Sequence, residues 1–112
     1  MIHIIAERAT PAQLQEMQET LETYIKKLAV DVQRRVLAGG GEMHADCEAA
    51  LLEDGSRQED VWGADWFPAS RQVRCQSLIN IRSKQGNRSM EIQDETLRQT
   101  IEAIVRERLS EG

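Results

Sequence analysis

The apolar residues at the start of the chain form a short run and then recur at helical spacing. Residues 2–5 are mostly β-branched and apolar, which is typical of one strand. Thr10 and Pro11 suit the N-cap and first position of a helix, and Gln13 stands where a capping box needs it. The apolar positions that follow are Leu14, Met17, Leu21, Ile25 and Leu28. This pattern predicts an amphipathic helix after the strand.

Residues 29–38 fit two different structures. Val32 and Val36 continue the helical spacing, so a single helix over 11–37 is one interpretation. The runs 29–32 and 36–38 are rich in valine and enclose a polar turn, which favours a hairpin. A helix over 11–37 would also be long for a small domain. We predict the hairpin and keep the long helix as the alternative.

The middle of the chain predicts a helix followed by a second hairpin. Three glycines at 39–41 interrupt regular structure, and 45–54 is rich in Ala, Glu and Leu before Gly55, a suitable C-cap residue. Residues 61–67 alternate in the manner of a strand, and 73–82 form the predicted partner strand. The residues expected on the core face of that partner strand are Val73, Cys75, Ile79 and Ile81.

The last element is an amphipathic helix that begins after Asp94, a good N-cap residue. Its apolar stripe consists of Leu97, Ile101, Ile104, Val105 and Leu109. Residues 83–89 are expected to be a polar loop. The whole chain therefore predicts the order β-α-β-β-α-β-β-α: an α+β fold with an antiparallel-rich sheet of about five strands covered by three helices. We expect one globular domain over 1–112.

Composition and charge limit the classes of function. A net charge of −5 argues against general binding to nucleic acid or to an anionic membrane surface. The chain has no apolar run long enough for a membrane span, and its opening residues lack the basic region of a signal peptide. Cys47 and Cys75 form neither a disulfide framework nor a metal-ligand pattern, and we expect both to pack in the core. The expected location is the reducing cytoplasm.

The densest group of chemically useful side chains is His44, Asp46 and Glu48. On a strand all three would share one face, whereas on a helix only His44 and Glu48 would, one turn apart. An imidazole with carboxylates can bind a divalent metal or act as an acid–base pair. The simpler interpretation is that His44 caps a helix and that the acids complement the helix dipole.

Asp65 lies in an unusual segment between two tryptophans. If 61–67 is a strand, Trp62 and Trp66 point to one face and Asp65 to the other. We favour indoles that fill the core over an aromatic binding wall. A buried Asp65 needs donors, and we predict that Arg82 and Arg88 supply them.

Charge is divided between two neighbouring blocks. Residues 42–65 contain eight acids and one arginine, and 66–90 contain five basic residues and no acid. We expect the blocks to lie side by side and to neutralise each other in part, each exposed pair contributing about 0–1 kcal/mol. The alternative is that the basic strand and the loop 83–89 hold an anion such as phosphate.

Five stretches of the chain resemble a family of small, uncharacterised bacterial proteins, familiar from cyanobacteria, that carry a domain of unknown function. The stretches are GGEMHADCE at 40–48, LLEDGS at 51–56, QEDVWGAD at 58–65, LINIR at 78–82 and QGNRS at 85–89. The resemblance implies no activity, cofactor or catalytic residue. Our leading hypothesis is a non-catalytic module that forms a homodimer or binds a protein partner. The alternative is a small metal-dependent or acid–base enzyme that uses His44, Asp46 and Glu48, with Asp65 as a further candidate.

Overall fold

A computed structural model describes residues 1–17 and 25–110 of the chain. Within these residues, five strands form one antiparallel sheet in the order β1-β3-β2-β4-β5. The strands are β1 (His3–Ile5), β2 (Lys26–Asp31), β3 (Val36–Gly39), β4 (Val61–Phe67) and β5 (Gln72–Arg74). The α-helices are α1 (Pro11–Met17), α2 (His44–Glu53) and α3 (Glu95–Leu109). The predicted α+β class and element order are confirmed.

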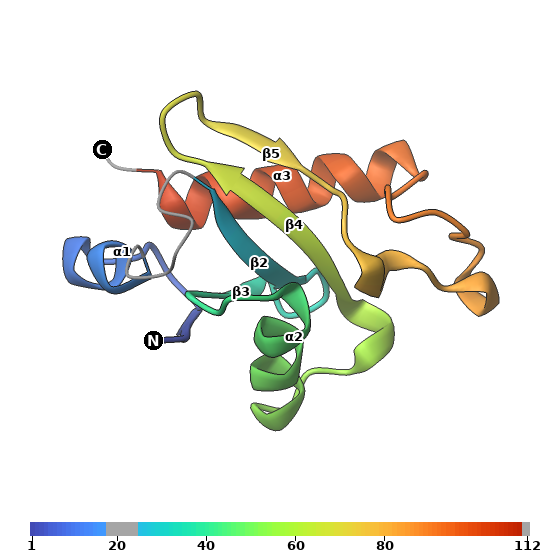
Figure 1. Cartoon of the computed structure of the whole chain (residues 1–112), viewed down its shortest axis with the longest axis horizontal. Coiled ribbons are helices and arrows are strands. Elements are labelled where there is room, and N and C mark those ends of the chain that lie inside the picture. The colour runs from blue at the N-terminus through green and yellow to red at the C-terminus, as the bar shows by residue number, and fades with distance from the viewer. Residues whose placement is uncertain (18–24, 111–112) are drawn as a thin grey trace.

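The sheet is the middle layer of the structure, with α2 on one face and α3 on the other (Figure 1). Because side chains alternate along a strand, neighbouring residues enter different cores. Leu28 and Val30 pack on the side of α3, whereas Ala29 packs with Cys47 and Leu51 of α2. Both faces of the central strands are therefore buried.

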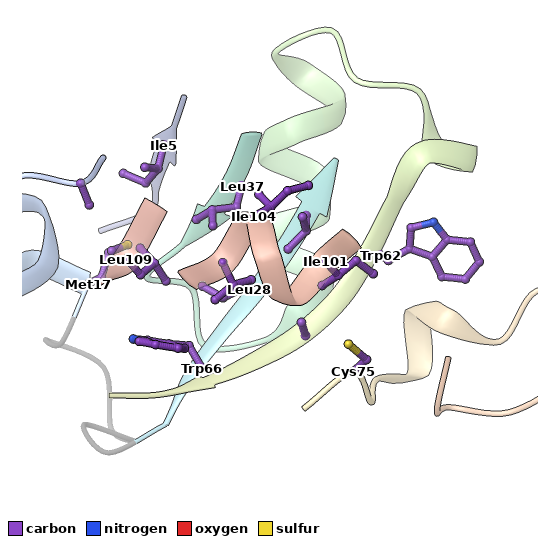
Figure 2. Packing of buried hydrophobic residues seen from close by; sticks show 14 of the residues in the cluster. Ile5, Met17, Leu28, Leu37, Trp62, Trp66, Cys75, Ile101, Ile104 and Leu109 are labelled. Atoms are coloured by element: carbon purple, nitrogen blue, oxygen red, sulfur yellow. The ribbon is translucent and has the colours of Figure 1, made fainter. Parts of the chain in front are cut away.

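The larger core lies between the sheet and α3. Ile101, Ile104 and Leu109 of α3 pack against Leu28 and Leu37, as predicted from the apolar stripe of that helix (Figure 2). Trp66 and Trp62 occupy opposite ends of the same cluster and are almost fully buried (Figure 2). The interpretation of the two indoles as core residues is confirmed.

The first helix begins as predicted but ends earlier. The Thr10 hydroxyl accepts the N–H of Gln13 at 3.1 Å, and the Gln13 amide oxygen accepts the N–H of Thr10 at 2.9 Å. Within the described residues the helix covers Pro11–Met17, and Ile25 and Leu28 are not helical, so the prediction that they belong to its stripe is wrong. Leu28 is instead a buried residue of β2, and the predicted position of Leu21 lies outside the described residues.

The hairpin over 29–38 is confirmed, which excludes the long helix. Strands β2 and β3 pair through Val30 and Leu37, and residues 32–35 form the turn. The buried carboxylate of Asp31 accepts the N–H groups of Gln33 and Arg34, both at 2.9 Å. This side chain fixes the turn in a way that the valine pattern does not reveal.

The prediction of one continuous strand over 73–82 is wrong. Strand β5 ends at Arg74, and the chain then forms two short 3-10 helices, η2 (Leu78–Asn80) and η3 (Ser83–Gln85). Ile81, expected on the core face, is 48% exposed. Figure 1 shows this segment, coloured yellow to orange, extending to the end of the molecule opposite α1.

On the edge of β4 away from β2, residues 61–63 lie beyond the reach of β5 and bond to side chains instead of to a strand. The amide of the buried Asn80 accepts the N–H of Gly63 at 2.7 Å and donates to its C=O at 3.0 Å. The guanidinium of Arg82 donates to the C=O of Val61. A Cβ at position 63 would lie 2.5 Å from Cβ of Ser77, so glycine is required where the loop approaches. Two polar side chains thus replace the missing part of β5.

A second buried amide fixes the rest of the loop. Asn87 donates through its side-chain nitrogen to the carbonyl oxygens of Asn80, Ser89 and Glu91 at 2.8–3.1 Å. Its side-chain oxygen accepts the N–H of Gln93 at 2.9 Å. The predicted polar loop over 83–89 therefore has a defined shape, because its buried amide is hydrogen-bonded to backbone groups.

Replacing Asn80 by alanine should destabilise the whole domain. The substitution leaves the N–H and C=O of Gly63 without their partner, and the C=O of Met90 loses a 3.1 Å bond. We expect a loss of about 3 kcal/mol in the free energy of unfolding, measured in urea. Gln99→Ala, which truncates an exposed amide on α3, is the control and should change stability by less than about 0.5 kcal/mol. Equal effects of the two substitutions would contradict this account.

Candidate functional site

Asp65 is a buried carboxylate on the α2 side of the sheet. Its side chain is 3% exposed and accepts hydrogen bonds from Arg74 at 2.9 and 2.7 Å. Its other oxygen lies 2.7 Å from Nε2 of His44. The prediction of burial with an arginine partner is right, but the predicted arginines, Arg82 and Arg88, are wrong. Arg74 is directly opposite Asp65 in the β4–β5 register, whereas the strand ends before position 82.

His44 connects the N-terminus of α2 to the central sheet. It is the first residue of the helix, and its side chain is 16% exposed. The expectation that His44 caps the helix is wrong, because its ring bonds to Asp65. Asp46 performs that role and accepts the N–H of Met43 at 3.2 Å.

Glu48 pairs with Arg82 at 3.2 Å, one helical turn beyond His44. The two side chains are 14% and 10% exposed. Burial raises the pKa of Glu48, an effect that attraction to Arg82 opposes, and burial lowers the pKa of Arg82. The guanidinium also lies 4.5 Å from the ring centroid of Trp62. The Arg82 guanidinium also donates hydrogen bonds to the carbonyl oxygens of Gln58, Val61 and Ile79 and to the side-chain oxygen of Gln85.

The candidate residues therefore form two separate pairs. His44 bonds to Asp65, Glu48 bonds to Arg82, and Asp46 bonds to the backbone. Within the described part of the chain, no three His, Cys, Asp or Glu side chains are placed to hold a metal ion. Sequence reasoning missed Arg74 and Asn80, although a correct strand register would have identified Arg74.

The two charge blocks lie side by side, as expected. They are joined by the ion pairs of Asp65 with Arg74 and of Glu48 with Arg82. Lys84 and Arg88 remain exposed on the loop. Because the N–H groups of Arg82 are directed at protein acceptors, this arginine is committed to the structure rather than to an external anion.

Both cysteines are buried as expected. Burial raises the pKa of the Cys47 thiol to about 11 and that of the Cys75 thiol to about 12. Thiols with such pKa values are almost entirely protonated near neutral pH, so they are poor nucleophiles.

A hollow of about 500 Å³ lies between α2, η2 and η3. Its charged wall includes Glu48, Glu59 and Lys84, and its apolar wall includes Leu78 and Ile81. Leu78 is 71% exposed and Ile81 is 48% exposed. Exposed apolar side chains that lie together on one surface mark candidate binding sites.

The fold and these contacts define a small α+β domain in which buried polar side chains hold an irregular loop against a sheet. The chain belongs to the family described as "Protein of unknown function (DUF5674)", which matches residues 3–108. No curated protein and no solved structure matches the chain. None of the helices within 1–17 and 25–110 is long and apolar enough to cross a membrane.

Asp65→Asn should be strongly destabilising. It removes the charge that His44 and Arg74 contact, while the shape of the side chain is kept. We expect a loss of about 2–4 kcal/mol in urea unfolding, towards the lower side of the range for buried pairs because Arg74 is half exposed. Glu7→Gln, at an exposed position near the start of the chain, is the control. Unchanged stability of Asp65→Asn would refute a structural role for the carboxylate.

The native protein should react slowly with thiol reagents. With a pKa of about 11, only about a thousandth of Cys47 is thiolate at pH 8. Labelling with an aromatic disulfide should be slow in buffer and fast in urea. Since folding holds these protons more tightly, stability should decrease as the pH rises from 9.0 towards 11. Rapid stoichiometric labelling of the folded protein at pH 8 would contradict this prediction.

Proposed function

We propose that this domain is a non-catalytic module that binds a protein through a surface centred on Leu78 and Ile81. The observation that carries the proposal is the exposure of these two side chains, 71% and 48%, on a loop that buried amides hold in place. A rigid apolar surface loses little conformational freedom on binding, which favours affinity. We call the pair Leu78 and Ile81 the apolar ridge.

The ion pairs formed by the candidate polar side chains support a non-catalytic role. Asp65 and Glu48, the buried acids of the candidate cluster, are both paired with arginines. An acid–base or metal-dependent enzyme has weaker support, because His44, Asp46 and Glu48 contact three different partners. The 2.7 Å bond between His44 and Asp65 is the feature that most resembles an acid–base pair.

The proposal also covers the cellular location of the module and the class of its partner. Two buried free cysteines suit a reducing compartment, which supports the cytoplasm. The net charge of −5 supports a protein partner over nucleic acid. A bacterial origin is supported by the sequence resemblance alone.

The apolar ridge should matter for binding and not for folding. We expect Leu78→Ala with Ile81→Ala to change the free energy of unfolding by about 1 kcal/mol, since Leu78 is mostly and Ile81 about half exposed to water. A photo-crosslinking amino acid at position 78, introduced in cells, should give a discrete adduct of defined mass. The same amino acid at position 103, an exposed site on α3, is the control.

The outcomes separate the possible roles. An adduct from position 78 that the alanine substitution at 81 weakens supports a binding surface. No adduct from position 78, or equal labelling from position 103, overturns the proposal. The mass of the adduct also distinguishes a second copy of the chain from a different protein.

A further inference from the structure

We infer that the partner of the apolar ridge is a second copy of this chain, bound through a two-fold symmetric contact. This inference rests on the proposed function and names the occupant of its surface. It follows from the distribution of charge and apolar groups around the hollow, which makes the surface complementary to itself.

One half of the surface is the outward side of α2, which is apolar and acidic. Ala45, Ala49 and Leu52 are exposed on this helix at spacings of four and three residues, so they share one side. Glu53 follows Ala49 by four residues and is also exposed. Glu59, in the wall of the hollow, is already paired with the exposed Arg57, so among the described residues Glu53 carries the unpaired negative charge of this side. We call this side the acidic half.

The other half is the segment 78–89, which carries the apolar ridge, and its unpaired charges are basic. Lys84 lies in the wall of the hollow and is exposed, and Arg88 is exposed further along the loop. Neither side chain forms an ion pair or a hydrogen bond among the residues that the structure describes. We call Leu78, Ile81, Lys84 and Arg88 the basic half.

The two halves form one continuous surface. Helix α2 packs against η2, which carries Leu78. Glu48 of α2 lines the hollow and pairs with Arg82, the neighbour of Ile81. Leu52 lies one turn after Glu48, so the exposed side of α2 adjoins the hollow.

A two-fold axis between the halves matches each half with its opposite in the other copy. In a two-fold contact, if the acidic half of one protomer meets the basic half of its partner, the reverse contact occurs as well. The leucine of α2 then meets the apolar ridge, and Glu53 faces Lys84 and Arg88. Complementary charge of this kind compensates for the overall repulsion between two chains of net charge −5.

The test reverses the charge of each half separately. The first variant carries Glu53→Lys, and the second carries Lys84→Glu and Arg88→Glu. Each variant alone has like charges on both halves, so its dimer dissociation constant should rise about tenfold or more in sedimentation equilibrium. An equimolar mixture should dimerise again, because one variant is then basic on both halves and the other acidic. Glu107→Lys, on the helix that covers the opposite face of the sheet, is the control.

The result that overturns the inference is a wild-type chain that stays monomeric up to millimolar concentration. A dimer that both charge variants leave unchanged, or a mixture that associates no better than its components, overturns it equally. A monomeric wild type with a discrete adduct of another mass from position 78 would reject self-association and keep the proposed binding function. No adduct at all would reject the binding function itself.

Discussion

The structure depends most on the placement of one buried guanidinium. Arg82 joins α2, the start of β4 and the loop between β5 and α3 through its bonds to Glu48, to Val61 and to neighbouring carbonyl groups. Taking such a charge out of water costs several kcal/mol, and the cost is offset only when every donor finds an acceptor. Here the acceptors come from three segments of the chain, so the arginine can be satisfied only when all three are in place. Stacking against Trp62 links this polar contact to the main core.

The second requirement is the exchange of strand pairing for side-chain pairing along β4. Residues 65–67 of β4 pair with residues 72–74 of β5. Nearer the start of the strand, the backbone groups of Gly63 and Val61 bond to the side chains of Asn80 and Arg82. This exchange lets the chain leave the sheet without leaving buried backbone groups unpaired. It also leaves Leu78 and Ile81 exposed, because Leu78 lies in η2 and Ile81 directly follows it, so neither residue follows the alternation of a strand.

Sequence reasoning predicted the elements whose pattern depends on local contacts. The cap of α1, the stripe of α3 and the hairpin over 29–38 all follow from the spacing of residue types along the chain. The site was predicted in part: Asp65 is buried and paired with an arginine, but the arginine is Arg74. Register between β4 and β5 decides that partner, and register depends on where the strand ends. Asn80 ends the strand through contacts made with residue 63, a distant position that no local pattern identifies.

The side-chain pairing along β4 has a consequence for how the protein behaves at high concentration. An open strand edge is a template on which another chain can add a strand, and sheets with such edges aggregate. Strand β4 lies between β2 and β5 in the sheet, yet β5 pairs only with its residues 65–67. Asn80 and Arg82 occupy the hydrogen-bonding groups of Gly63 and Val61 on the remaining edge. A foreign strand would have to displace a buried amide and a buried charge before it could pair there, which protects the sheet from edge-to-edge growth.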